Sequence, residues 1–147
     1  MKRFFLMFFS FLFLVGCNSK STNDSKVLKC SSTKTVGSTV SIQDYEIFFK
    51  KEKLDRLSMS IDVTLDDHDE VTRDNLENEV SNAFADYKSR DGVSYSSNVK
   101  DNGFNVRLDV NFSKLNDQDK ASISIINYEK SYDEIKSEFE NNDFSCK

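Results

Sequence analysis

Cysteine and histidine are the residues of this chain that are best suited to covalent or metal chemistry, and the chain has three cysteines and one histidine. Cys17 directly follows Leu14-Val15-Gly16, which ends an apolar run that begins at Phe4 after a basic start. A charged start, a short apolar stretch and a small residue before the cleavage point are typical of a signal peptide. With a cysteine next, the pattern indicates a bacterial lipoprotein signal at residues 1–16, after which the Cys17 thiol carries a diacylglyceryl group through a thioether.

The length of the apolar run distinguishes this interpretation from a transmembrane helix. The run from Phe4 to Val15 would span roughly 18 Å as a helix, whereas the hydrocarbon core of a bilayer is about 30 Å thick. We therefore expect a mature chain held at the extracytoplasmic face of the cell membrane by acyl chains such as palmitate. A plain cleaved signal and a short uncleaved anchor are the alternatives.

Cys30 and Cys146 remain as an even pair once Cys17 is assigned to lipid, and they lie near the two ends of the region expected to fold. Paired cysteines in an exported protein are typical of a disulfide. Closing so long a loop would stabilise the fold by about 4–5 kcal/mol in the chain-entropy account. Two free thiols are the alternative, because many bacteria that make such lipoproteins use few disulfides, and neither cysteine has a partner spaced for metal binding.

His68 lies in the acidic segment Asp66–Glu70, whose carboxylates could orient an imidazole or share a cation. The segment lacks the further His or Cys ligands of a zinc site, and Val71 stands where an EF-hand loop counted from Asp66 requires glycine. Asn116-Asp117-Gln118-Asp119 also lacks that glycine and the closing glutamate. We interpret the segment around His68 as a solvated loop before a helix, and we expect no metal site and no cofactor.

Sequence signatures of nucleophilic catalysis are absent. The chain has no Gly-x-Ser-x-Gly elbow, no Ser-x-x-Lys followed by Lys-Thr-Gly and, with four glycines, no loop that could cradle a phosphate. Only His68 or a lysine could act as the base that a serine or cysteine nucleophile needs. Paired carboxylates for sugar hydrolysis stay open, since their separation depends on the fold. We expect a protein that is not an enzyme and has no catalytic residue.

The net charge of the chain argues against partners that are themselves strongly anionic. The chain has 20 basic and 25 acidic residues, and its net charge is −5. Removal of residues 1–16 takes away two basic residues and no acidic one, which leaves a net charge of −7. A surface of that sign repels phosphate backbones and anionic lipid headgroups. We therefore expect no nucleic-acid partner, and we expect the acyl chains alone to hold the protein at the membrane.

Residues 17–29 are expected to form the lipidated cysteine and a polar tether, because Asn18–Lys26 contains no apolar residue to bury. Residues 30–147 are expected to form a single domain. The mature chain is long enough to bury a core of its own.

Two sequence periods predict the first elements of this domain. Residues 40–65 alternate apolar and polar along two strands on either side of a charged turn at Lys50–Lys53, with a bulge near Gln43 and Asp44 where the phase changes. Residues 69–90 then take a helical period, and Gly92 is expected at the C′ position of that helix. The helical stripe comprises Leu76, Val80, Ala83, Phe84 and Tyr87.

A second hairpin is predicted at residues 93–112 around Asn102-Gly103, a pair that favours a type I′ turn. Residues 113–120 predict a short helical connection and residues 122–128 a β-like segment. The capping-box spacing of Ser131 and Glu134 predicts a final helix. The order β-β-α-β-β-(α)-α predicts an α+β fold, in which two hairpins form an antiparallel sheet with helices packed on one face.

Four tyrosines allow two interpretations. They could form an exposed aromatic recognition surface, or they could be half-buried core residues with a solvated hydroxyl, which we favour. These residues are Tyr45, Tyr95, Tyr128 and Tyr132.

The layout of the chain resembles the YehR-like family of small lipoproteins from low-GC Gram-positive bacteria. The similar parts are the signal through Cys17, the first hairpin with its charged turn, the helix ending at Tyr87-Lys88, the strand opening at Gly92-Val93 and the segment from Tyr132 to Lys147. The resemblance implies the α+β fold, a location outside the membrane, and a pairing of a cysteine just before the first strand with one at the C-terminus, which Cys30 and Cys146 match. It implies no catalytic residue, because the family has no assigned activity.

Together these patterns favour a non-enzymatic surface lipoprotein that binds or scaffolds an envelope or extracellular protein. A small-ligand or cation-binding accessory lipoprotein is the alternative, and an envelope hydrolase is a more distant one.

Overall fold

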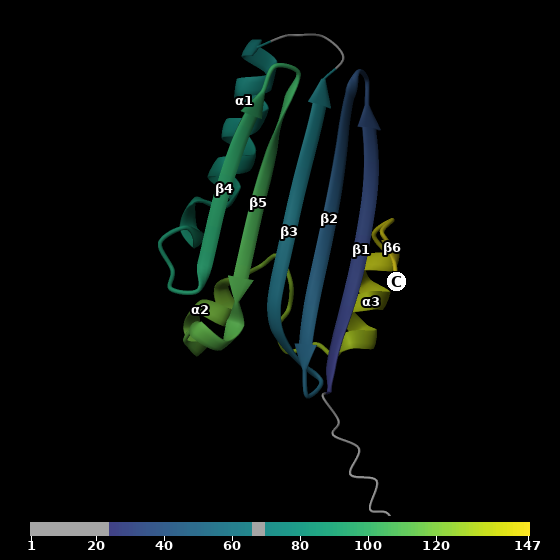
Figure 1. Ribbon diagram of the computed structural model, residues 1–147, viewed down its shortest axis with the longest axis vertical. Helices are drawn as coiled ribbons and strands as arrows, with labels where there is room; N and C mark the ends of the chain where they lie inside the picture. The colour runs from purple at the N-terminus through teal and green to yellow at the C-terminus, as the bar shows by residue number, and fades with distance from the viewer. Residues whose placement is uncertain (1–23, 66–69) are drawn as a thin grey trace, which may run out of the picture.

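A single six-stranded antiparallel sheet forms the frame of the computed structural model, which describes residues 24–65 and 70–147 (Figure 1). Cys17, the signal and His68 lie outside the described residues. The spatial order of the strands is β4-β5-β3-β2-β1-β6. The strands are β1 (Ser25–Val36), β2 (Thr39–Lys50), β3 (Lys53–Leu65), β4 (Val93–Lys100), β5 (Gly103–Asn111) and β6 (Ser145–Cys146).

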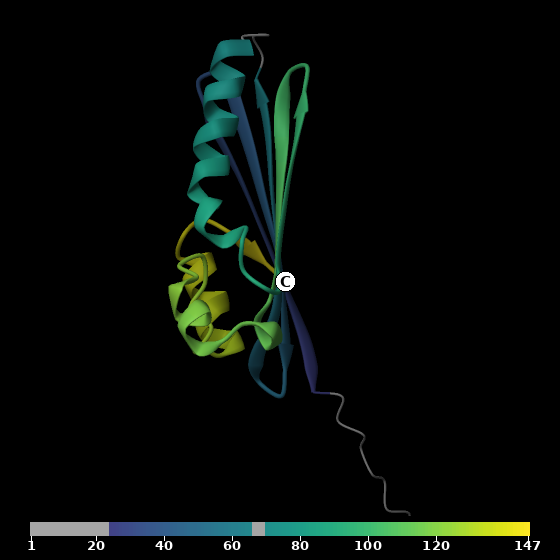
Figure 2. The same cartoon turned by 90° about the vertical axis from the view of Figure 1, so that its left-hand side faces the viewer.

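All the described helices lie on one side of this sheet, and the other side is open (Figure 2). They are α1 (Glu70–Ala83), the 3-10 turn η1 (Ala85–Tyr87), the 3-10 turn η2 (Phe112–Lys114), α2 (Asp117–Ser122) and α3 (Tyr132–Glu140). The predicted α+β class, with an antiparallel sheet and helices on one face, is confirmed.

Strict alternation of apolar and polar residues explains why the helices cover only this face. In β5, Phe104, Val106, Leu108 and Val110 are fully or almost fully buried, while the intervening residues are exposed or half-buried. The neighbouring β3 buries Leu57, Met59 and Val63 in the same way. Because successive side chains of a strand point to opposite faces, the apolar phase of each strand forms one continuous core beneath the helices.

Strand β1 is an element that the sequence pattern did not predict. It pairs with β2 along twelve residues, from Ser25↔Lys50 to Val36↔Thr39. Ser25–Lys29, which the sequence analysis assigned to the tether, therefore belong to the sheet. Most of this strand is exposed, so its ladder with β2 rather than a strong apolar alternation holds it in place.

The bulge expected near Gln43 and Asp44 is not present. The β2–β3 register is continuous from Thr39 to Phe48 and shifts only between Phe48 and Phe49. Ile42 belongs to the phase that faces away from the helices, and 39% of its surface is exposed. The change of phase in the sequence thus reflects apolar residues on the open face rather than an extra residue in the strand.

The second hairpin is confirmed, but its turn differs from the type I′ turn expected at Asn102-Gly103. Lys100 pairs with Gly103, so Asp101 and Asn102 are the central turn residues, and neither has a positive φ. Gly103 is required for another reason. A Cβ atom at Gly103 would lie 1.9 Å from the carbonyl oxygen of Val63, so the close approach of β5 to β3 excludes a side chain.

The helix predicted at residues 69–90 is shorter, because α1 ends at Ala83 and η1 follows. Leu76, Val80, Phe84 and Tyr87 of the predicted stripe pack against the core, but Ala83 is exposed. Gly92 lies beyond η1, directly before β4, and is therefore not the C′ residue of α1. Its φ is 84°, and a Cβ there would lie 2.7 Å from Cβ of Lys114.

The C-terminal third follows the sequence pattern more closely. The short helical connection appears as η2 and α2, and the capping box of α3 makes both of its hydrogen bonds between Ser131 and Glu134. The β-like segment expected at residues 122–128 is wrong, because no strand forms there. Ile123 and Ile126 lie in this irregular segment, and their side chains are buried beneath the sheet.

A disulfide joins Cys30 to Cys146, as expected, and links β1 to the short edge strand β6. The two cysteines face each other in the antiparallel ladder with their Cα atoms 4.1 Å apart. Lys29 and Lys147 exchange both backbone hydrogen bonds at the next position, with N···O distances of 3.0 and 2.9 Å. The family resemblance implied a cysteine just before the first strand, but Cys30 lies inside β1.

Candidate functional site

The uncovered side of the sheet, which we call the open face, is a broad surface that no described helix covers (Figures 1 and 2). It is formed by the polar phase of the strands whose apolar phase makes the core. Its central part is lined by lysine, arginine, aspartate, glutamate and serine side chains from five strands. Because successive side chains of a strand point to opposite faces, the pleat of β1, β2, β3 and β5 positions the candidate site as well as the core.

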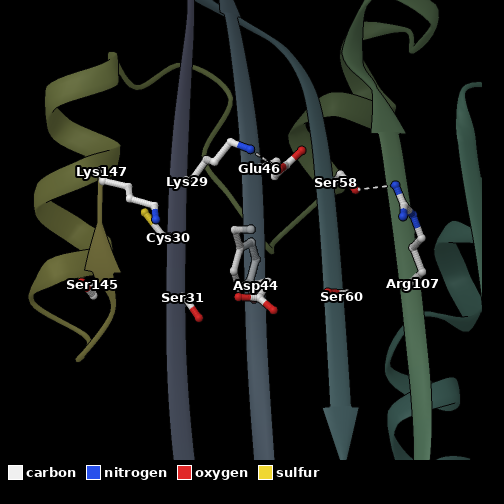
Figure 3. Close-up of a pocket in the computed structure, with 11 residues that line it drawn as sticks. Lys29, Cys30, Ser31, Asp44, Glu46, Ser58, Ser60, Arg107, Ser145 and Lys147 are labelled. Atoms are coloured by element: carbon white, nitrogen blue, oxygen red, sulfur yellow. Dashed lines mark hydrogen bonds and ion pairs between the residues drawn. The ribbon is translucent and has the colours of Figure 1, made fainter.

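A hollow of about 630 Å³ lies in the middle of the open face (Figure 3). Strand pairing places its side chains in two adjacent rows. One row contains Lys29, Glu46, Ser58 and Asp109 in register across β1, β2, β3 and β5. The next row contains Ser145, Ser31, Asp44, Ser60 and Arg107 across β6, β1, β2, β3 and β5.

The first row is held together by charge pairs at both sides of the hollow. Lys29 Nζ donates to Glu46 Oε1 at 2.6 Å. Arg107 reaches across from the neighbouring row and donates to both carboxylate oxygens of Asp109, at 2.9 and 3.3 Å, and to Ser58 Oγ at 3.2 Å. A bidentate arginine–carboxylate pair fixes the guanidinium in one plane, so the edge of the hollow has a defined arrangement of donors.

The protonation state of Asp109 follows from competing effects. Partial burial raises its pKa, but hydrogen bonds from Arg107 and Ser58 and the positive charge of Arg107 together outweigh that effect and lower the pKa below its ordinary value. The same carboxylate raises the pKa of the Arg107 guanidinium. Both groups are therefore ionised at neutral pH.

Asp44 differs from the other charged residues of the hollow. It is exposed, and its side chain has neither an ion pair nor a hydrogen bond among the described residues. Ser31 and Ser60 lie directly opposite it on the two neighbouring strands (Figure 3). The centre of the hollow thus presents one uncompensated carboxylate flanked by hydroxyl groups.

This arrangement is suited to hydrogen bonding and charge recognition. Serine hydroxyls both donate and accept hydrogen bonds, and the carboxylate of Asp44 accepts them. Within residues 24–65 and 70–147, no group of three or more His, Cys, Asp or Glu side chains is placed to hold a metal ion. The same described residues contain no helix that is long and apolar enough to cross a membrane.

Two other groups of candidate residues have structural roles. Asn116 caps α2, because its side-chain oxygen accepts a hydrogen bond from the Asp119 backbone N–H at 2.8 Å. The Asn116–Asp119 segment is therefore the first turn of a helix.

The four tyrosines are all half-buried and pack against the core. Tyr45, for example, lies between the rings of Phe139 and Phe144, with centroid distances of 4.8 and 5.4 Å.

The open-face residues were not among the candidates predicted from the sequence. The signal that could have found them is the polar phase of the strands, in which Ser58 and Ser60 alternate with buried Leu57 and Met59. That phase normally marks only the solvent side of a sheet. Strand order and register are needed to see that Asp44, Ser60 and Arg107 lie in one row.

Comparison with known proteins establishes the fold. The chain matches no protein-family model and no curated protein sequence. It resembles the NMR structure of a protein from Streptococcus pneumoniae TIGR4, with a TM-score of 0.55 and 13% sequence identity. The similarity covers 100% of this chain and 98% of the other. At this identity the similarity shows a shared fold alone.

Proposed function

We propose that this chain is a non-enzymatic lipoprotein, of the YehR-like kind, that binds an envelope or extracellular protein through the open face. A diacylglyceryl group on Cys17 anchors it at the extracytoplasmic face of the cell membrane. The observation that carries the proposal is the open face itself. A six-stranded sheet that leaves one whole side uncovered keeps a broad polar surface available to a partner.

The position of the N-terminal end of the domain supports this use of the open face. The described chain begins at Asp24, at the end of the sheet where the β2–β3 turn also lies (Figure 1). An anchor attached a few residues before Asp24 holds the domain by that end. The open face runs along the strands and away from the anchor, so a partner can approach it from the side.

The charges of the hollow indicate the chemistry of the partner. Lys29 is paired with Glu46, and Arg107 with Asp109, so these charges are already compensated. Asp44 is not. A partner that supplies a cationic or donor-rich group at this point compensates a carboxylate whose neighbours Ser31 and Ser60 provide further hydrogen bonds.

The non-enzymatic part of the proposal rests on the same geometry. Ser58 accepts a hydrogen bond from the Arg107 guanidinium, which cannot act as a base because it stays protonated. Lys29, which also lines the hollow, is paired with Glu46 rather than with a serine, whereas a serine nucleophile needs a base beside it.

The anchor is tested by following the protein in cells. We expect labelled palmitate to be incorporated into the wild-type chain and the protein to fractionate with the membrane. The Cys17→Ser variant should incorporate no label and leave the membrane fraction. Wild-type protein without label, or a Cys17→Ser variant that fractionates like the wild type, would refute the anchor.

Binding is tested by site-specific photocrosslinking in intact cells. A photoreactive residue at Ser60, in the hollow, should give a discrete adduct, whereas one at the exposed Ser137 of α3 on the opposite side should not. Asp44→Asn, which removes the charge and keeps the shape, should reduce the Ser60 adduct. Asp86→Asn in η1, on the helical side, is the matched control. Equal adducts at both positions, or no effect of Asp44→Asn, would contradict the proposal.

A further inference from the structure

Basic residues gather at the end of the sheet where the described chain begins, although the chain as a whole is acidic. Lys26 is near the start of β1, and Lys50, Lys51 and Lys53 surround the β2–β3 turn. The backbone N–H of Lys51 donates to the carbonyl of Asp24 at 2.8 Å, which holds this turn against the start of β1. We call these four lysines the lysine end.

Most of this positive charge is not neutralised by neighbouring residues. Lys26 forms an ion pair with Glu52 at 2.8 Å. Lys50, Lys51 and Lys53 have no ion pair among the described residues, and all three are exposed. Residues 24–27 and 48–56 together contain five basic and three acidic residues, a net charge of +2. The adjoining α2–α3 region adds two basic and three acidic residues, which leaves a local net charge of +1, against −7 for the mature chain; these residues are Asp117, Lys120, Glu129, Lys130 and Asp133.

The conformation of the turn is a second observation. Lys51 and Glu52 both have positive φ, 51° and 61°, as in a type I′ turn. Asparagine and glycine adopt this conformation at lower cost than residues with long side chains. The turn therefore has charged residues, Lys51 and Glu52, at two positions where its backbone conformation favours asparagine or glycine.

An exposed valine and a half-buried phenylalanine lie directly beside these lysines. Val27 and Phe48 face each other across β1 and β2, and 41% of the Val27 surface is exposed. The guanidinium of Arg56 lies over the Phe48 ring, with its Cζ atom 4.5 Å from the centroid. Cations next to exposed apolar side chains are typical of surfaces that rest in the headgroup region of a bilayer.

We propose that the lysine end docks on the anionic phospholipid headgroups of the membrane that holds the anchor, so that the strands stand upright on the bilayer. This inference rests on the proposed anchor at Cys17. The seven residue-to-residue steps from Cys17 to Asp24 reach at most about 25 Å when extended, so the anchor keeps this end near the lipid. Charges attract headgroups strongly only within about 10 Å, and the lysines are the cations that the tether holds there.

This proposal differs from the expectation drawn from net charge. The net charge of −7 of the mature chain predicts repulsion from anionic lipid only when the charge is spread evenly over the surface. Here the basic residues at one end let the molecule approach anionic lipid in one orientation and disfavour the others. The acyl chains then supply the affinity, and the lysine end supplies the orientation.

The test uses the chain from Cys17 onward, coupled through the Cys17 thiol to a maleimide lipid in vesicles. The disulfide leaves Cys17 as the single free thiol. The chain contains no tryptophan, so one introduced tryptophan is a unique donor for energy transfer to a dansyl-labelled headgroup. Ser25→Trp reports on the lysine end, and Ser38→Trp reports on the β1–β2 turn at the opposite end of the sheet.

We compare phosphatidylcholine vesicles with vesicles of equal parts phosphatidylcholine and phosphatidylglycerol. Anionic lipid should raise the energy transfer from Ser25→Trp and lower that from Ser38→Trp, so that their ratio changes by about twofold or more. About 0.5 M NaCl should abolish the change without any substitution, because screening removes the attraction. A ratio that does not depend on phosphatidylglycerol would overturn the proposal.

Matched triple variants localise the effect. Lys50→Gln, Lys51→Gln and Lys53→Gln together should make anionic vesicles behave like phosphatidylcholine vesicles. The same loss of charge at Lys34, Lys88 and Lys100, away from the lysine end, should leave the change intact; an equal loss there would also overturn the proposal. Because the coupling is chemical, the vesicle result does not depend on whether cells acylate Cys17, so the two proposals fail separately.

Discussion

The two faces of the sheet are built from neighbouring residues of the same strands, yet they serve different purposes. In β5, Leu108 is completely buried beneath the helices, while Arg107, the residue before it, is exposed beside the hollow. Burial of a large apolar side chain stabilises a fold by about 1.5–3 kcal/mol, whereas an exposed ion pair contributes about 0–1 kcal/mol. The covered face therefore maintains the fold, whereas the open face contributes little to stability and is the face through which we propose a partner binds.

The largest effect on the free energy of unfolding is expected from the disulfide at one edge of the sheet. Replacing Cys30 and Cys146 together by serine releases a loop with a sequence separation of 116 residues and should lower the free energy of unfolding by about 4 kcal/mol. Urea denaturation of the variant and the wild type measures the difference. A reduced wild-type protein should match the variant; if both are as stable as the oxidised wild type, the disulfide does not support this edge.

The comparison between faces is sharpest at adjacent positions of β5. Leu108→Ala leaves a cavity in the core and should cost about 3 kcal/mol. Arg107→Ala, one residue away, removes only exposed hydrogen bonds and should cost less than about 1 kcal/mol. Chemical denaturation of both variants measures these values. Similar losses at the two positions would mean that the open face also supports the fold.

The helical layer that covers the sheet should respond to the loss of its cap. Ser131→Ala removes the hydroxyl that accepts from the Glu134 backbone N–H, and should destabilise α3 by about 1 kcal/mol. Ser137→Ala in the same helix is the control, because alanine there is at least as good a helix former. Thermal unfolding followed by circular dichroism distinguishes the two variants. Equal melting temperatures would show that the cap contributes nothing.

The smallest effect is expected on the open face, from the pH dependence of Asp109. Its pKa is lowered in the folded state, so its contribution to stability is present above the unfolded pKa and is lost as the pH falls through the folded pKa. Asp109→Asn should therefore cost a few tenths of a kcal/mol near neutral pH and nothing in strong acid. Urea titrations at several pH values measure this difference, which should not widen in acid.

Local chemistry accounts for the parts of the fold that were predictable. The alternation along β3 and β5 and the Ser131–Glu134 spacing can each be read within a short stretch of chain, so they predicted two strands and a helix start. The disulfide was predictable because the two cysteines left after Cys17 form an even pair. Strand β1 was missed because its Ser, Thr and Lys residues carry little alternation, and its pairing with β2 and β6 supplies the order. The turn type predicted from Asn102-Gly103 was wrong, because the glycine at position 103 is required by the close approach of its backbone to Val63 and not by the turn.

The candidate site was less predictable than the fold. Asp44 and Ser60 are separated by a turn and most of two strands, and they become neighbours only through the register of β2 with β3. The lysine end also depends on topology, since Lys26 and Lys51 meet because β1 begins where β2 ends. Composition averages over such groupings, so the net charge of the chain could not predict a group of basic residues at one end of the sheet.

The cystine between β1 and β6 has a mechanical consequence if the chain is held by its N-terminal end, as we propose. Tension that enters at Ser25 runs along β1 only as far as Cys30 before it meets a covalent branch into Cys146. From there the load divides between the remainder of β1 and the segment that leads back to α3. Such tension can separate no more than the first residue pairs of the β1–β2 ladder before two backbones share the force.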